Sequence, residues 1–257
     1  MTQKDKAHAF ARLHTRGDPL VLYNIWDAGS AGALAKAGAP ALATGSASVA
    51  GAQGYGDGQK IPMATLLQIV ERIVAVAPDL PVSVDFEGGY AVEPDTLVEN
   101  SRALIAAGAV GINFEDQLVG GQGLHSVSDQ AARIAAIRAA ADSLGLPLFI
   151  NARTDLFLKA ESDAHADLLP EALARAAAYA EAGASGFFVP GLIDPAMIAR
   201  ICDGTVLPVN VMVSPAAPPK AVLVDCGAAR LSHGPFPYFA MLQDLGAAYL
   251  KAAEKSG

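Results

Sequence analysis

The fold is decided by the stretch Val82-Ser83-Val84-Asp85-Phe86-Glu87-Gly88-Gly89-Tyr90. It begins as a β-branched apolar run, which is typical of a buried strand, and it ends in two carboxylates and two glycines. Because side chains two apart in a strand point to the same side, Asp85 and Glu87 face one way where the strand stops. Two like charges there are unfavourable unless they are solvated or bridged by a cation. The stretch alone leaves two interpretations open, an acidic solvated turn and a metal site.

Eight strand-helix units run along the chain, and the stretch above contains the third strand. Strands are predicted at 20–24, 41–44, 82–85, 110–114, 148–152, 186–189, 209–212 and 229–232. Helices are predicted at 7–16, from Asp27 or Ser30 to Gly38, and at about 62–76, 94–107, 127–144, 168–182, 194–203, 219–225 and 236–254. Odd-numbered strands follow a proline and even-numbered strands follow a small-Gly-Ala turn, which closes the preceding helix. Residues 45–48 are predicted to form a loop of small residues.

This alternation predicts a parallel sheet covered by helices, and eight units in 257 residues predict a (β/α)8 barrel. A doubly wound open sheet is the alternative, but no G-x-G-x-x-G motif follows the first strand. No linker or shift of composition divides the chain. Residues 1–257 are therefore expected to form a single α/β barrel domain with an N-terminal and a C-terminal helix.

Composition limits the classes of partner. Hydrophobic residues make up 52% of the chain and charged residues 17%, which is ample for a large core. The net charge of −8 argues against nucleic acid, because phosphate binding requires a basic patch. No apolar run resembles a signal peptide or is long enough to span a bilayer. We expect a soluble, cytoplasmic protein without membrane partners, in which Cys202 and Cys226 stay reduced.

Polar residues stand where the predicted strands end, and in a parallel barrel this is the active-site face. They are Asn24, Trp26, Asp27, Gly45, Ser46, Ala47, Asp57, Asp85, Glu87, Glu115, Asp116, Gln117, Arg153, Asp155, Asn210, Ser232 and His233. Several carboxylates converge with one cation, Arg153, and hard oxygen ligands suit Mg²⁺ or Mn²⁺. The ion would leave Arg153 to bind a substrate carboxylate, and the loop at Gly45-Ser46-Ala47 could present N–H groups to a second anionic group. This combination suits the enolate of a 2-oxo acid.

Structural roles are open for several of these residues. Asp27 could cap a helix, and Asp116 and Asp155 could pair with donors at the barrel rim. Trp26 could belong to the core, and His233 could pack against the rim. The remaining alternatives are that Asn210 satisfies neighbouring polar groups, that His125 is solvated, and that His8, His14 and His165 lie on the surface.

Six stretches, in this order along the chain, resemble the isocitrate lyase / phosphoenolpyruvate mutase superfamily. They are Asn24-Ile25-Trp26-Asp27-Ala28, Thr44-Gly45-Ser46-Ala47, Gly54-Tyr55-Gly56-Asp57-Gly58, Val84-Asp85-Phe86-Glu87-Gly88-Gly89-Tyr90, Phe114-Glu115-Asp116-Gln117 and Ala152-Arg153-Thr154-Asp155. The resemblance implies a (β/α)8 barrel, usually oligomeric, that binds Mg²⁺ and a 2-oxo-acid-like substrate. It also implies roles for individual residues. Asp85 would be the direct metal ligand, Asp57, Glu87 and Glu115 would hold the metal's waters, and Arg153 with the backbone of Ser46-Ala47 would bind the oxo-carboxylate end. Trp26 and Asn210 would also lie at the substrate.

Two segments depart from the superfamily pattern. The loop Leu118-Val119-Gly120-Gly121-Gln122-Gly123-Leu124-His125 lacks the Cys and Lys of the cleaving lyases and the Lys and Asn of the mutases. Val189-Pro190-Gly191 stands where the lyases place a glutamate after strand six. Cleavage of isocitrate or methylisocitrate is therefore not expected, and the enolate-stabilising half of the site remains.

We therefore expect a Mg²⁺-dependent enzyme of the carbon–carbon lyase type that acts on a small anionic 2-oxo or 2-hydroxy acid, by cleavage, decarboxylation or hydrolysis of an oxaloacetate-like substrate. Asp57, Arg153 and His233 are the candidate catalytic residues, with His233 or a metal-bound water as the proton source. The alternatives are a mutase or hydrolase that breaks a C–P bond of a phosphonopyruvate-like substrate, a carboxylate-binding protein without catalysis, and a class II type aldolase. A homo-oligomer, dimer or tetramer, is expected.

Overall fold

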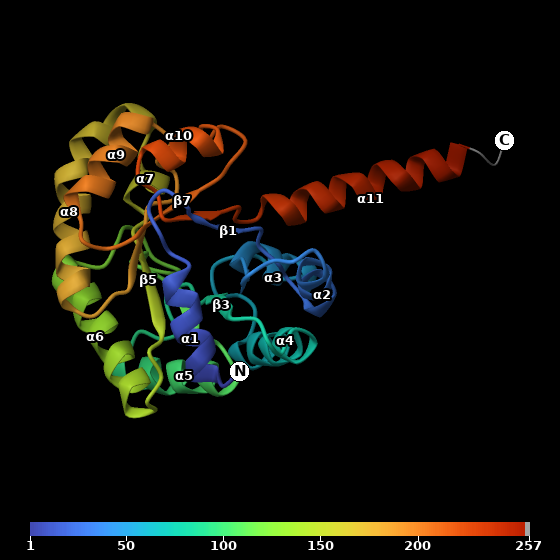
Figure 1. Ribbon diagram of the computed structural model, residues 1–257, viewed down its shortest axis with the longest axis horizontal. Coiled ribbons are helices and arrows are strands. Elements are labelled where there is room, and N and C mark those ends of the chain that lie inside the picture. The colour runs from blue at the N-terminus through green and yellow to red at the C-terminus, as the bar shows by residue number, and fades with distance from the viewer. Residues whose placement is uncertain (255–257) are drawn as a thin grey trace.

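Eight parallel strands form the centre of the molecule in the computed structural model, which describes residues 1–254 (Figure 1). They are β1 Leu20–Leu22, β2 Leu42–Ala43, β3 Val82–Asp85, β4 Gly111–Glu115, β5 Phe149–Arg153, β6 Gly186–Phe188, β7 Val209–Met212 and β8 Arg230–Ser232. The hydrogen-bonded order is β1-β8-β7-β6-β5-β4-β3-β2. A parallel bridge between Ile25 and Thr44, just beyond β1 and β2, brings the two edges together. The predicted (β/α)8 barrel is confirmed.

Helices cover the outside of the barrel. They are α1 Gln3–Arg12, α2 Ala28–Lys36, α3 Ser46–Ala52, α4 Met63–Val76, α5 Pro94–Ala106, α6 Val127–Ser143, α7 Leu156–Lys159, α8 His165–Glu181, α9 Pro195–Gly204, α10 Lys220–Asp225 and α11 Phe236–Glu254, with a short 3₁₀ turn at Ser162–Ala164. Most predicted helices are confirmed to within a few residues.

Three local predictions were wrong. Residues 46–52 form α3 rather than a loop, with Gly45 as its N-cap. The segment between β5 and α8 contains α7, which the sequence patterns did not indicate. The first helix starts at Gln3, because Thr2 and Asp5 form a reciprocal capping box that satisfies free N–H groups of the first turn.

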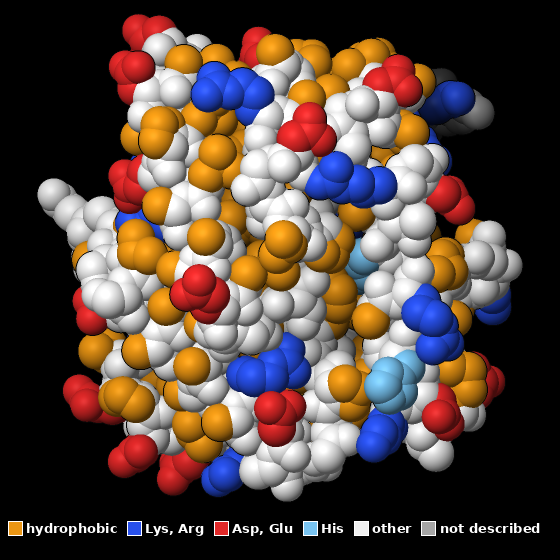
Figure 2. Space-filling view, turned by 60° about the vertical axis from the view of Figure 1, so that its left-hand side comes forward, with side chains coloured by type: hydrophobic (Ala, Val, Ile, Leu, Met, Phe, Trp, Pro, Cys, Tyr) orange, Lys and Arg blue, Asp and Glu red, His pale blue; other side chains and the backbone are white. Residues whose placement is uncertain are grey.

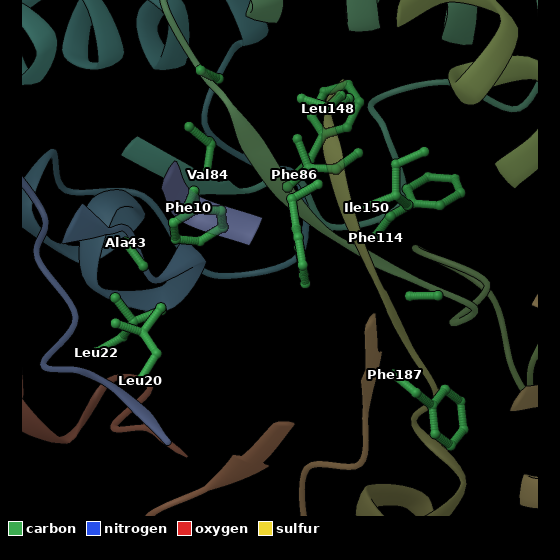
Figure 3. Packing of buried hydrophobic residues seen from close by; sticks show 14 of the residues in the cluster. Phe10, Leu20, Leu22, Ala43, Val84, Phe86, Phe114, Leu148, Ile150 and Phe187 are labelled. Carbon is green, nitrogen blue, oxygen red and sulfur yellow. The ribbon is translucent and has the colours of Figure 1, made fainter. Parts of the chain in front are cut away.

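Buried hydrophobic side chains of the strands and helices pack into one core cluster (Figure 3). Register pairs Gly111 with Phe149 at the amino-terminal end, and Glu115 with Arg153 at the carboxyl end. Phe10 of α1 is completely buried against Phe149, with ring centroids 5.4 Å apart, so α1 closes the amino-terminal end. A Cβ on Gly111 would come within 2.8 Å of the Phe10 ring, which explains the glycine there. The other end is left open for a site.

Two histidines predicted at the surface lie elsewhere. His165 is buried, and its Nε2 lies 3.0 Å from the carbonyl oxygen of Phe157. His14 is partly buried and stacks on Phe149 at 4.0 Å between ring centroids. His14 follows the end of α1 and His165 begins α8, and both are covered by contacts with aromatic rings that the short amphipathic pattern does not reveal.

The last helix, α11, projects away from the barrel (Figure 1). Its exposed apolar side chains are Phe239, Leu242, Leu245, Tyr249 and Leu250. In the face shown in Figure 2, charged side chains of both signs are scattered without forming one large patch. None of the helices within residues 1–254 combines the length and apolar character needed to cross a bilayer. Cys202 and Cys226 are both buried free thiols, as predicted.

Candidate functional site

A cleft of about 230 Å³ opens at the carboxyl ends of the strands. Its polar lining comes from Asn24, Ser46, Asp57, Asp85, Asn113, Arg153 and Ser232. Its apolar wall comes from Leu158, Phe188, Pro190, Met212 and Pro235. Six of the predicted site residues therefore meet here, since Gly45 and Ala47 line the same cleft as Ser46, Asp57, Asp85 and Arg153.

Asp85 ends β3 and faces the cleft. Its Oδ2 accepts a hydrogen bond from the backbone N–H of Ser46 at 3.0 Å, and its own N–H donates to Thr44 Oγ1 at 2.9 Å. Its Oδ1 is buried and has no partner within residues 1–254. Burial raises the pKa of Asp85, which Arg153 and Ser46 oppose and Asp57 reinforces. An unpartnered oxygen on a buried carboxylate is the kind of position that a cation would satisfy.

Glu87 lies behind Asp85 and does not line the cleft. It is 3% exposed and adopts a left-handed backbone with φ of 50°. Its Oε2 accepts from the N–H of Gln59 at 2.7 Å, and Gln59 is itself left-handed, with φ of 57°. Its Oε1 accepts from the hydroxyl of Tyr90 at 3.2 Å. Burial, with Asp85 nearby, raises the pKa of Glu87 to about 7. Glu87 and both of its hydrogen-bond partners, Gln59 and Tyr90, are thus left-handed non-glycine residues, and such strain is concentrated at functional sites.

The turn after Glu87 depends on Gly89, which has φ of 82°. A Cβ at this position would lie 2.3 Å from Leu97 Cδ1 and 3.1 Å from the ring of Phe114. No side chain fits there, so the glycine allows the acidic turn to pack closely on the barrel.

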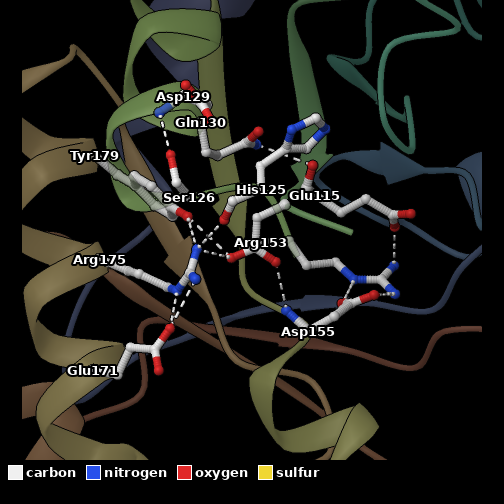
Figure 4. Close-up of polar contacts among 11 residues, drawn as sticks. Glu115, His125, Ser126, Asp129, Gln130, Arg153, Asp155, Glu171, Arg175 and Tyr179 are labelled. Carbon is white, nitrogen blue, oxygen red and sulfur yellow. Dashed lines mark hydrogen bonds and ion pairs between the residues drawn. The ribbon is translucent and has the colours of Figure 1, made fainter. Parts of the chain in front are cut away.

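Arg153, at the end of β5, is held between two carboxylates (Figure 4). Its Nη1 lies 3.1 Å from Glu115 Oε2, and its Nη2 donates to Asp155 Oδ2 at 3.0 Å. Burial raises the pKa of Glu115, and the Arg153 guanidinium opposes this rise. The guanidinium also lies over the Phe188 ring at 5.9 Å. The cation predicted to be available for substrate is therefore already neutralised in part by the protein.

Asp116 has a structural role, as one interpretation of the sequence predicted, and its partners Arg175 and Tyr179 are labelled in Figure 4. Its side chain is fully buried, and its Oδ2 lies 3.1 Å from Arg175 Nη1 and accepts from the Tyr179 hydroxyl at 3.0 Å. Its Oδ1 accepts from the backbone N–H of Asp155 at 2.9 Å. The buried pair of Asp116 and Arg175 thus anchors the residue that in turn orients Arg153.

The cleft lining does not include the predicted site residues Trp26, His233 and Asn210, in addition to Glu87 and Glu115. Trp26 packs against Tyr238, with ring centroids 5.2 Å apart, in a separate surface depression. His233 lies against Tyr23 at 5.1 Å, because its neighbours Ser232 and Gly234 face the cleft and alternation turns it outward. Asn210 is buried in β7, and neither atom of its amide group has a partner within the described chain. Neither Trp26 nor His233 lines the cleft.

Asp27 is a helix cap. Its carboxylate accepts from the N–H of Ser30 at 2.7 Å, and the Ser30 hydroxyl accepts from the N–H of Asp27 at 3.1 Å. This local pair accounts for Asp27 without a role in the site.

The donor set fits a hard divalent cation. Asp57 and Asp85 line the cleft, while Glu87 and Glu115 are buried behind it. Within residues 1–254, no three His, Cys, Asp or Glu side chains are arranged to bind one metal ion together. The predicted arrangement needs one direct ligand only, and Asp85 Oδ1 is the carboxylate oxygen without a partner. Oxygen donors of this kind suit Mg²⁺ or Mn²⁺.

Sequence reasoning missed Asn113 of β4 and Arg230 of β8, which both point into the barrel. Asn113 lines the cleft, and Arg230 is completely buried beneath it. The signal was present, because an asparagine within Val110-Gly111-Ile112-Asn113-Phe114 and an arginine at the start of a buried strand both interrupt apolar runs.

Comparison with known proteins gives consistent similarities. Residues 10–253 match the family model described as phosphoenolpyruvate phosphomutase. An uncharacterised protein of Mycobacterium tuberculosis is 36% identical over 235 residues, which are 91% of this chain and 84% of that protein. The 2-methylisocitrate lyase of Escherichia coli is 29% identical over 215 residues, covering 81% of this chain and 70% of the lyase.

A solved structure from Burkholderia cenocepacia J2315, of a protein named as a candidate phosphonomutase, superimposes with a TM-score of 0.95. It is 48% identical and covers 98% of this chain and all of that one. Less similar sequences include an oxaloacetate decarboxylase of Pseudomonas savastanoi pv. phaseolicola, which is 29% identical over 70% of this chain and 62% of that protein.

Proposed function

Because the chain belongs to the phosphoenolpyruvate phosphomutase family, within the phosphoenolpyruvate mutase/isocitrate lyase superfamily, we propose that it is a Mg²⁺-dependent enzyme that stabilises the enolate of a small 2-oxo acid and breaks a carbon–carbon bond. Decarboxylation of an oxaloacetate-like acid is the preferred reaction. The observation that carries the proposal is the buried, unpartnered Oδ1 of Asp85 in a cleft that also contains Asp57 and Arg153.

A divalent ion bound there would stabilise negative charge that develops on the substrate's oxo oxygen. Asp85 would hold the ion directly, with Asp57, Glu87 and Glu115 acting through its waters. The cleft lining contains two carboxylates, Asp57 and Asp85, and one cation, Arg153, so the balance of charge there favours a further cation. This distribution supports the metal assignment independently of the family resemblance.

Arg153 would bind the carboxylate next to the oxo group. Of the five N–H groups of the guanidinium, two are hydrogen-bonded to Asp155 and Nη1 also faces Glu115, which leaves one N–H each on Nη1 and Nη2. Glu115 and Asp155 hold the group in place, so little side-chain entropy is lost when it binds an anion. The N–H of Ser46 is taken by Asp85, so the amide of Ala47 is the remaining donor proposed on this rim.

The apolar wall suits loss of carbon dioxide. Leu158, Phe188 and Met212 contribute apolar surface to the cleft. A carboxylate held against apolar atoms is poorly solvated, whereas carbon dioxide has no charge to solvate. Contact with these side chains therefore favours loss of the carboxylate as carbon dioxide. Asp57 lines the cleft without an ion-pair partner in residues 1–254, and in our proposal it passes a proton to the enolate carbon after carbon dioxide has left.

A C–P bond mutase or hydrolase is the second candidate, because the 48% identical relative is named as a candidate phosphonomutase. A phosphonate carries more negative charge than a carboxylate, and Arg153 is the single Lys or Arg among the cleft residues of the described chain. The paucity of cations is the reason to prefer carbon–carbon cleavage.

Measuring which substrate the protein turns over distinguishes carbon–carbon cleavage from C–P cleavage and from carboxylate binding alone. The purified protein is mixed with Mg²⁺ and oxaloacetate, and pyruvate is measured with a coupled assay, beside phosphonopyruvate, 2,3-dimethylmalate and 2-methylisocitrate. We expect oxaloacetate decarboxylation that EDTA abolishes and that Asp85→Asn reduces at least 100-fold. A rate no greater than that of Mg²⁺ alone contradicts the preferred reaction. Binding of oxalate without turnover of any substrate would indicate the carboxylate-binding protein instead.

A further inference from the structure

The floor of the cleft contains three polar side chains from three strands. Asn113 of β4, Asn151 of β5 and Arg230 of β8 are 4%, 1% and 0% exposed. Asn113 Oδ1 accepts a hydrogen bond from Asn151 Nδ2 at 2.9 Å and another from Arg230 Nη2 at 3.1 Å. Of the three, Asn113 alone lines the cleft. A buried asparagine is thus held from below by two donors while its other edge meets the site.

These contacts determine which way the Asn113 amide points. A guanidinium has only donors, so the Asn113 atom that faces Arg230 must be the oxygen. The Asn151 atom that faces the same oxygen must then be its nitrogen. Asn113 Nδ2 is left on the opposite edge, and it has no acceptor within residues 1–254. The register of β3 and β4 pairs Asn113 with Asp85, so this donor lies in the same layer as the proposed metal ligand.

Arg230 is a buried charge without an ion pair among the described residues. Its Nε donates to Ser232 Oγ at 3.1 Å, while its Nη1 has no partner. Burial lowers the pKa of Arg230 to about 9, and the negative charge of Asp85 opposes this effect. An isolated buried cation is unfavourable unless an anion lies near it. Its positive potential extends towards the cleft above, where an anionic ligand would offset its cost.

We propose that Asn113 is a substrate-binding residue whose Nδ2 donates a hydrogen bond to an oxygen of the bound oxo-carboxylate group, and that Arg230 is a positioning residue that fixes the direction of this amide. The inference rests on the proposed function, because it assigns a second recognition group to the same site. Asn113 and Arg153 would then contact the anionic ligand from two sides, the first from the floor and the second from the rim.

The test measures binding of oxalate, a non-reacting dicarboxylate, to the whole protein by calorimetry in the presence and absence of Mg²⁺. Asn113→Asp keeps an oxygen for Arg230 and Asn151 but removes the donor. Asn113→Leu removes the donor without adding charge, so it separates loss of a hydrogen bond from charge repulsion. The surface variant Gln243→Glu, on α11, is the matched control for an amide-to-carboxylate change.

We expect both Asn113 variants to weaken oxalate binding at least tenfold, as for a hydrogen bond to a charged group. Asn113→Leu should leave the affinity for Mg²⁺ alone within about twofold, since it changes no charge, and the Gln243 variant should match the wild type. If wild-type protein binds oxalate with Mg²⁺ and Asn113→Leu binds it equally well, the inference is overturned and the proposed function stands. If the wild type binds no oxalate, both the inference and the proposed function are refuted.

Arg230 is tested by its effect on the same affinity. Arg230→Met frees the Asn113 amide to rotate, and we expect oxalate binding to weaken about three- to tenfold, with partial recovery in Arg230→Lys, which restores a donor. Thermal unfolding of the metal-free variants is measured in parallel. A change of melting temperature without a change of oxalate affinity would assign Arg230 to packing alone and overturn its positioning role.

Discussion

Replacing Asp85 by asparagine should change stability and metal binding in opposite directions. In the metal-free protein the Asp85 carboxylate is buried, has one oxygen without a partner, and lies near other carboxylates that include Asp57. Because burial raises its pKa, the charged form destabilises the folded state at a pH above that value. The amide keeps the acceptor for the N–H of Ser46 and removes the charge. Without metal at pH 8, we therefore expect a higher free energy of unfolding for the variant than for the wild type.

The effect of Mg²⁺ should be reversed. A ligand that binds only the folded state at 100 times its dissociation constant adds about 2.7 kcal/mol to the free energy of unfolding. The wild type should show a gain of this size when Mg²⁺ is added, and Asp85→Asn should show almost none. The variant would therefore be more stable than the wild type in EDTA and less stable in Mg²⁺.

Urea unfolding followed by circular dichroism measures both quantities, in EDTA and in saturating Mg²⁺. Asp142→Asn is a suitable control, because Asp142 is an exposed carboxylate on α6 whose weak ion pair lies far from the cleft. The reasoning is refuted if Asp85→Asn is no more stable than the wild type in EDTA, or if Mg²⁺ stabilises the variant and the wild type equally.

Three further changes test other parts of the structure. Arg175→Met leaves the buried carboxylate of Asp116 without its ion pair, so we expect the free energy of unfolding measured in urea to fall by about 3–5 kcal/mol. Adding Asp116→Asn to the same chain removes the unpaired charge and should restore part of this loss. Burial lowers the pKa of His14 from 6.5 to about 3, so on acidification the unfolded chain binds the proton first and the free energy of unfolding falls below about pH 6.5. Between about pH 6.5 and 4.5, His14→Phe should remove about 2 kcal/mol of this loss. Parallel curves of unfolding free energy against pH for the two proteins would contradict this. Leu245 is 63% exposed in the apolar face of α11. If this face forms the interface of the expected homo-oligomer, Leu245→Glu should lower the mass measured by light scattering. A wild type that is already monomeric would exclude this arrangement.

The barrel could be predicted because its signals are local. A proline or a Gly-Ala turn before each strand, and apolar runs of strand length between helical segments, depend on neighbours only a few residues away. The cap formed by Asp27 and Ser30 belongs to the same class, since its partners are three residues apart. The short helices α3 and α7 were missed because so few residues carry no clear helical period.

The site was only partly predictable. Placing Asp57, Asp85 and Arg153 at one mouth followed from the topology, because parallel strands end on the same side. Which way a side chain turns at the end of a strand depends on how the chain leaves the barrel. His233 shows this, since it follows Ser232 directly and yet lies against Tyr23 outside the cleft.

The amino-acid sequence by itself determines the order of strands and helices, the carboxyl-end location of the acidic residues and the family of the chain. Which distant side chains pair with one another is decided by the tertiary structure. Arg175 reaches Asp116 across 59 positions, and Arg230 reaches Asn113 across 117. No periodicity or spacing encodes such pairs, because they depend on which strands become neighbours and how deeply they are buried. Burial also decides the chemistry of Asp85-Phe86-Glu87: the same two carboxylates would be a solvated turn at the surface, and become a candidate metal site where water is excluded and one oxygen is left without a partner.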